Sequence, residues 1–172
     1  MTELFEQVAQ RPESRSLTGG LWARRVTMTA FGVIAALALA GVFGQEGTTT
    51  RAQGPQARMS LGAPRTVRGG VFFQARVELR ALRAIEHPRL VLGRGWVEGL
   101  QVNSIEPSAA SESSRDGRLV LSYDGLKAGD RMTVWFQFQV NPTQPGRRDL
   151  SIELDDAEQP VARVSRKLTV MP

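Results

Sequence analysis

The sequence contains one run of nineteen residues without a charged side chain, from Val26 to Gly44. As a helix with a rise of about 1.5 Å per residue, this run would be about 28 Å long, close to the thickness of the hydrocarbon core of a bilayer. The sequence therefore predicts a transmembrane helix over residues 26–44. The lipid bilayer is the first partner that we expect.

The residues that flank the apolar run predict its orientation. Trp22 and the pair Arg24 and Arg25 precede it, and both residue types suit the boundary between membrane and water. Basic residues are more numerous shortly before the run than shortly after it, and positive charge stays on the cytoplasmic side. We therefore expect residues 1–25 to form a cytoplasmic tail and the C-terminal part to be extracytoplasmic.

A cleavable secretory signal is an alternative interpretation of the same run. Ala38, Leu39 and Ala40 have the small-x-small form of a cleavage site, and the paired arginines resemble part of a twin-arginine signal. The long polar segment before the run and the length of the run favour an uncleaved anchor. Both interpretations export the C-terminal part, and the uncleaved one predicts a single-pass protein of the cell membrane.

Small residues recur at every fourth position of the apolar run. They are Gly32, Ala36, Ala40 and Gly44. Such a stripe lets a second helix approach closely and predicts a helix-packing face, although a run rich in alanine also produces this spacing by chance.

The chain after the apolar run changes character twice. Residues 45–56 lack apolar periodicity and predict a flexible stalk. Residues 57–172 alternate apolar and polar side chains, as strands with one solvated face do. The strands expected from this pattern are Val71–Ala81, Arg131–Val140, Arg148–Asp155 and Arg118–Tyr123, with weaker candidates at Ala57–Leu61, Arg89–Leu92, Leu100–Ile105 and Val161–Val170. Seven or eight short strands separated by turn residues predict an all-β antiparallel sandwich.

Several segments of this region resemble a known family. They are Asp116–Leu121, Leu126–Gly129, Val134–Pro142 and Gly146. Together they are similar to the second half of bacterial extracytoplasmic immunoglobulin-like domains. Arg24 and Arg25, with Phe138–Pro142 and Gly146–Arg148, also resemble uncharacterised single-span membrane proteins of high-GC bacteria. This resemblance covers about residues 24–172 and implies an immunoglobulin-like sandwich with a partner protein in the same membrane. It implies no activity.

Composition and motifs argue against several kinds of site. The chain has no cysteine, which excludes thiolate metal ligands and a cysteine nucleophile. Its net charge of +5 is scattered rather than clustered, so we expect no nucleic-acid partner. The sequence contains no Gly-x-Ser-x-Gly motif that would present a serine nucleophile to the single histidine, His87. The late acidic residues, Asp149, Glu153, Asp155, Asp156 and Glu158, lack the spacing of a calcium loop. We expect no enzyme activity, no catalytic residue, no bound metal and no cofactor.

One surface has the composition of a protein interface. If Val134, Phe136 and Phe138 face inward, alternation turns the intervening residues outward. The predicted partner surface consists of Trp135, Gln137, Gln139, Arg147 and Arg148, and Trp and Arg are enriched in interfaces. Burial of Trp135 beneath a loop or the first strand is the alternative.

These features favour a non-catalytic accessory or interaction subunit of an envelope membrane complex. The second hypothesis is a stand-alone surface module that binds a cell-wall glycan or an extracellular protein.

Overall fold

The computed structural model describes residues 16–39 and 47–172, which belong to two compact units, Met1–Gly44 and Gln45–Pro172. The first unit contains helix α1, Ser16–Leu39. The second contains thirteen strands and a short 3₁₀ helix, η2, at Arg94–Trp96. The strands are β1 Gly47–Gln53, β2 Ala57–Pro64, β3 Thr66–Arg68, β4 Phe72–Ala81, β5 Pro88–Leu92, β6 Leu100–Glu106, β7 Ser111–Arg115, β8 Arg118–Ser122, β9 Arg131–Val140, β10 Gly146–Asp149, β11 Ile152–Asp156, β12 Gln159–Val164 and β13 Lys167–Met171.

Helix α1 differs in its bounds from the predicted span of residues 26–44. It begins ten residues earlier, at Ser16, and its described part ends at Leu39. Residues 40–44 of the apolar run lie outside the described residues. No helix in the described parts of the chain combines the length and the apolar character needed to cross a membrane.

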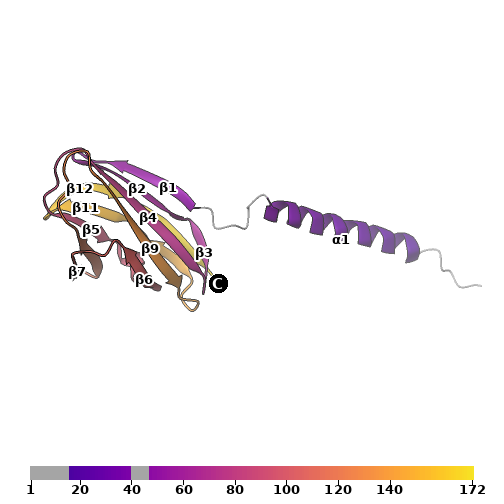
Figure 1. The fold of residues 1–172 in the computed structure, drawn as a ribbon. Helices are drawn as coiled ribbons and strands as arrows, with labels where there is room; N and C mark the ends of the chain where they lie inside the picture. The colour runs from indigo at the N-terminus through magenta and orange to yellow at the C-terminus, as the bar shows by residue number, and fades with distance from the viewer. Residues whose placement is uncertain (1–15, 40–46) are drawn as a thin grey trace, which may run out of the picture. The chain divides into compact units, whose positions relative to one another are not determined.

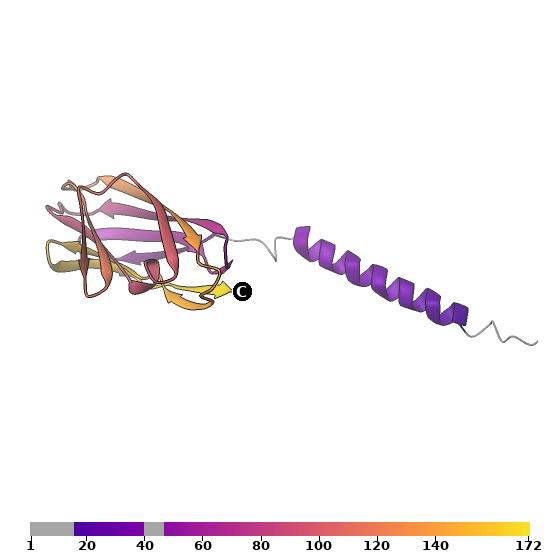
Figure 2. The ribbon, with the colours of Figure 1, turned by 90° about the horizontal axis from the view of Figure 1, so that it is seen from below.

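The strands of the second unit form two five-stranded sheets and one three-stranded sheet (Figures 1 and 2). The first sheet has the order β1-β2-β4-β9-β6, the second β12-β11-β5-β8-β7, and the third β10-β13-β3. The one parallel pair among the described strands joins β13 to β3, where the chain ends in Figure 1. Strands β2-β4-β9-β6 and β5-β11-β12 follow the A-B-E-D and C-F-G orders of immunoglobulin constant domains. The fold is therefore an all-β antiparallel sandwich with an immunoglobulin-like strand order.

The structure has thirteen strands where the sequence predicts seven or eight. Strand β9 has the predicted bounds, Arg131–Val140. The predicted strands Arg148–Asp155 and Val161–Val170 are each divided in two, giving β10 and β11 and then β12 and β13. Strands β1, β3 and β7 are not predicted. The flexible stalk is corrected in part, because Gly47–Gln53 forms β1 and pairs with β2 in antiparallel register.

Helix η2 follows β5 directly and places Trp96 in the core. Its indole ring is completely buried, with ring centroids 5.4 Å from Phe136 and 5.2 Å from Phe138. The indole Nε1 donates a hydrogen bond to the carbonyl of Ser151, at 3.1 Å. A buried indole needs such an acceptor, so this bond and the aromatic contacts fix η2 between the layers.

The same carbonyl explains the division between β10 and β11. Ser151 O also accepts a hydrogen bond from the backbone N–H of Gly93, at 2.8 Å. A Cβ on Gly95 would lie 2.6 Å from the carbonyl oxygen of Asp149, so only glycine fits this approach of two backbones. The strand is interrupted where η2 packs against it.

Strand β1 is held on the sandwich by a buried arginine from the β12–β13 connection. Arg166 Nη1 donates to the carbonyl of Thr48 at 2.7 Å and to Oγ1 of Thr50 at 3.0 Å. Its Nη2 also bonds to Oγ1 of Thr48 and to the carbonyl of Ala63. Charge-assisted bonds of this kind are stronger than neutral ones, so a polar segment without an apolar face becomes an ordered edge strand.

We expect Trp96→Ala to lower the free energy of unfolding by about 3–5 kcal/mol, because it leaves a large cavity between the layers. Trp135→Ala is the matched control, and we expect it to lower this free energy by about 1 kcal/mol or less, because that ring is partly exposed. Denaturant unfolding of the full chain, followed by circular dichroism, measures both. Equal losses would contradict the central position of Trp96.

We expect Arg166→Met to release β1 while leaving the rest of the sandwich folded. The substitution keeps the apolar stem but removes the hydrogen bonds that the Arg166 guanidinium donates to Thr48 and Thr50. With β1 then held only by its pairing with β2, its amide exchange should accelerate at least tenfold. Hydrogen exchange read by mass spectrometry should show no comparable change in β4 or β9. Arg65→Met, which removes an exposed neighbouring arginine, should leave β1 protected.

Candidate interaction surface

Trp135, which the sequence predicts to be part of a partner surface, lies on the outer face of the β1-β2-β4-β9-β6 sheet. Along β9, Val134, Phe136 and Phe138 are completely buried, while Trp135 remains 38% exposed. Gln137 is exposed and Gln139 is partly exposed on the same side of the strand. No loop or strand in the described chain buries Trp135.

Arg76 of β4 connects Trp135 to the rest of this face. The two residues are direct cross-strand partners, and the guanidinium carbon lies 5.2 Å from the centroid of the indole ring. Arg76 Nη2 also forms an ion pair with Glu78, at 3.1 Å. Gln74 lies opposite Gln137 in the next row. The result is a partly exposed stack of arginine on tryptophan, bordered by amides.

The two arginines of the predicted surface lie elsewhere. Arg147 and Arg148 belong to β10, in the three-stranded sheet, and not to the sheet of Trp135. Arg147 is exposed, and Arg148 Nη2 donates to the carbonyl of Gln144 at 2.9 Å. The structure therefore places Trp135, Gln137 and Gln139 on one strand, and Arg147 and Arg148 on a strand of another sheet.

The predicted helix-packing face is only partly described. Gly32 and Ala36 lie on α1, and a Cβ at Gly32 would meet nothing within 4 Å. Ala40 and Gly44 lie outside the described residues.

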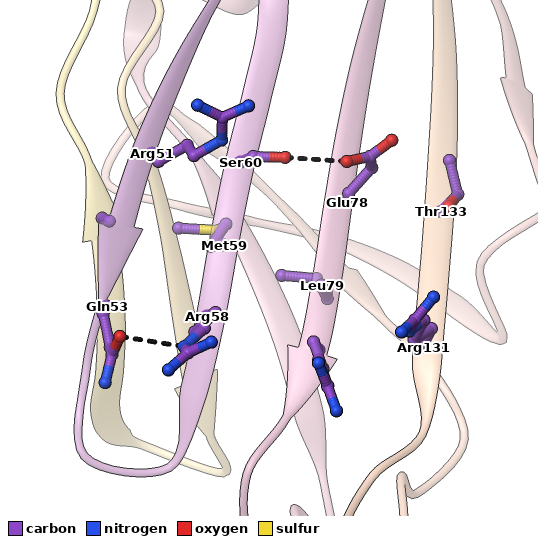
Figure 3. A pocket seen from close by; sticks show the side chains of 11 residues that line it. Arg51, Gln53, Arg58, Met59, Ser60, Glu78, Leu79, Arg131 and Thr133 are labelled. Carbon is purple, nitrogen blue, oxygen red and sulfur yellow. Dashed lines mark hydrogen bonds between the residues drawn. The ribbon is translucent and has the colours of Figure 1, made fainter.

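The same sheet face also carries a basic groove, which no pattern in the sequence predicts. The groove has a volume of about 760 Å³ and spans β1, β2, β4 and β9. Figure 3 shows its side chains on neighbouring strands, with Arg58 and Arg131 at one level of the sheet and Ser60 and Glu78 at another. Its charged residues are Arg51, Arg58, Arg80, Arg131 and Glu78.

Hydrogen bonds in the groove leave most of its positive charge unmatched. Ser60 Oγ donates to Glu78 at 3.0 Å, and Arg58 Nε donates to Gln53 Oε1 at 2.9 Å. Glu78 already pairs with Arg76. Among the described residues, none of the four groove arginines forms an ion pair.

The opposite sheet contains arginine–carboxylate ion pairs between its strands. Arg118 pairs with Glu153 at 2.8 Å, and Arg115 pairs with Asp155 at 3.3 Å. Glu153 and Asp155 are thus engaged in ion pairs of the fold, and Asp156 accepts a hydrogen bond from the backbone N–H of His87. His87 itself is exposed. Within residues 16–39 and 47–172, no group of three or more His, Asp or Glu side chains is arranged to hold a metal ion.

Three groups outside the groove have shifted pKa values. Burial raises the pKa of Asp155 despite its bond to Arg115. Burial, with a smaller contribution from Arg65, lowers the pKa of Arg166. Burial, with the nearby charge of Glu112, raises the pKa of Tyr123 to about 12. Burial in the sandwich is the main cause of all three shifts.

No protein-family model and no curated protein matches the chain. Among solved structures, the chain is similar to a non-cellulosomal cohesin from the hyperthermophilic archaeon Archaeoglobus fulgidus, with 16% identity, a TM-score of 0.43 and coverage of 73% of this chain and 92% of that chain. It is similar to a CARDB domain from Pyrococcus furiosus, with 13% identity, a TM-score of 0.40 and coverage of 72% and 94%. It is also similar to an exo-β-N-acetylglucosaminidase from Vibrio harveyi, with 15% identity, a TM-score of 0.35 and coverage of 68% of this chain and 18% of that chain. At these identities and TM-scores, the similarities assign no function or partner to this chain.

We expect Tyr123, the one tyrosine of the chain, to ionise with a pKa of about 12 in the folded protein. The unfolded chain should release this proton near pH 10. Because the folded state binds the proton more tightly, the free energy of unfolding falls as the pH rises from about 10 toward 12. Absorbance of tyrosinate measures the ionisation, with circular dichroism reporting the fold at each pH. Glu112→Gln should lower the native pKa, and native ionisation near pH 10 would contradict the assignment.

Proposed function

We propose that this chain is a non-catalytic accessory subunit of an envelope complex, held at the membrane by residues 26–44. Its sandwich binds another protein through the outer face of the β1-β2-β4-β9-β6 sheet. The observation that carries the proposal is the partly exposed Trp135, stacked with Arg76 and flanked by Gln74 and Gln137.

The chemistry of this face supports binding to a protein. Tryptophan and arginine dominate binding energy in protein interfaces. The ring of Trp135 is held in place by Arg76, so little side-chain freedom is lost when a partner covers it. A hollow of about 300 Å³, lined by Gln74, Gln137, Trp135 and two residues of β6, lies beside the ring. A partner side chain of moderate size would fit there.

The uncharged run of residues 26–44 supports the membrane anchor. Several large apolar side chains of α1, including Val26, Phe31 and Ile34, are more than half exposed. At 100° per residue they point to all sides of the helix rather than to one stripe, and a helix of this kind is covered by other protein or by lipid. The resemblance to single-span proteins of high-GC bacteria suggests that the partner lies in the same membrane.

We expect a photo-reactive phenylalanine analogue at Gln137 to crosslink the full chain, in intact cells, to one membrane protein. The adduct should be recovered from the membrane fraction and identified by mass spectrometry. Adding Trp135→Ala to this chain should reduce the adduct about tenfold or more, because it removes the central contact of the interface.

The matched control carries the analogue at Arg163, which is exposed on β12 of the opposite sheet. It should give no adduct with that protein. Equal adducts from both positions would exclude the face of Trp135 as the specific interface. Retention of wall glycan in place of a membrane protein would support a stand-alone surface module instead.

A further inference from the structure

We infer that the basic groove beside Trp135 binds an acidic, extended segment of the partner protein. This inference rests on the proposed function and adds the chemistry of the partner. The register of β2, β4 and β9 places three arginines side by side. Arg58 lies directly opposite Arg80, and Arg80 lies directly opposite Arg131. We call these three residues the arginine row. All three are exposed.

The arginine row is unfavourable for the sandwich by itself. Like charges directly opposite each other on neighbouring strands are destabilising, and neighbouring strands are only about 4.8 Å apart. Arg51, on β1, adds a fourth positive charge to the groove. The one carboxylate that lines the groove, Glu78, is already bonded to Ser60 and Arg76. A bound anion would remove this repulsion.

Guanidinium groups favour ligands that carry carboxylate or phosphate. They bind such groups through paired, charge-assisted hydrogen bonds. The groove volume of about 760 Å³ lies in the usual range for ligand sites. Gln53, Ser60 and Thr133 add neutral hydrogen-bonding groups along its walls. The groove therefore suits a ligand with several anionic groups on a polar chain.

The position of the groove favours an acidic protein segment over a phosphate polymer. Thr133 lines the groove, and Trp135 is the next residue on the same side of β9. Arg76 contacts Trp135 and pairs with Glu78, so it joins the two surfaces. A protein can cover the tryptophan and present carboxylates to the arginine row at the same time. The row spans about 10 Å across three strands, the length of about three extended residues.

The test measures binding of fluorescent deca-glutamate to the purified full chain in mild detergent at low and at physiological salt. Deca-glutamine and inorganic polyphosphate are the comparison probes. We expect deca-glutamate to bind, binding to weaken as salt increases, and deca-glutamine not to bind. Arg58→Gln with Arg131→Gln should weaken binding at least tenfold.

The matched control is Arg163→Gln with Lys167→Gln, which removes two exposed charges from β12 and β13. It should bind deca-glutamate within about twofold of the unchanged chain. The melting temperature of the groove variant should be equal to or higher than that of the unchanged chain, because like-charge repulsion is removed. A lower melting temperature would assign the arginine row a structural role.

Binding of polyphosphate alone, or equal weakening by both double variants, would overturn the acidic-segment proposal. These outcomes are separate from failure of the proposed function. If the unchanged chain with the analogue at Gln137 gives no crosslink in cells, the proposed partner interface is wrong. If deca-glutamate does not bind, only the proposed acidic character of the partner segment is wrong.

Discussion

The contact of Trp96 with the inner face of β9 determines which residues the sandwich presents to solvent. Phe136 and Phe138 pack against the buried indole ring, so both must face inward. Side chains in a strand alternate between faces, and a slip of one residue would exchange the two sets. The packing of Trp96 thus places Trp135 and Gln137 outside. An interaction at the surface depends on an aromatic cluster within the core.

The parts of the fold that were predictable are those in which burial alone sets the pattern. Strand β9 has the predicted bounds because its apolar residues alternate without interruption. Strand β1 was not predictable, since its side chains alternate between exposed and only partly buried and its anchor, Arg166, lies 118 residues beyond Thr48. Strand β7 is polar along its whole length and is ordered through pairing with β8. Such tertiary contacts leave no periodic pattern in the sequence.

The candidate site also has a part that the sequence predicts and a part that it does not. The outward position of Trp135 follows from alternation within one strand. The arginine row does not, because Arg58, Arg80 and Arg131 come from three segments and become neighbours only through the registers of β2, β4 and β9. Arg147 and Arg148 are close to β9 in sequence, yet they belong to a different sheet. Sequence pattern can assign a residue to a face, whereas cross-strand register decides which residues share a row.

The two main sheets differ in how the charged side chains of neighbouring strands are paired. On β8 and β11, Arg118 and Glu153 form a close pair, as expected where charges serve the fold. On β2, β4 and β9, three arginines stand in register without carboxylate partners among the described residues. The aligned arginines add like-charge repulsion and, within the described parts of the chain, contribute no ion pair that would stabilise the sandwich. The unmatched charge is the basis of the proposed acidic ligand, and its continuity with the stack of Arg76 on Trp135 is the reason to propose one partner for both surfaces.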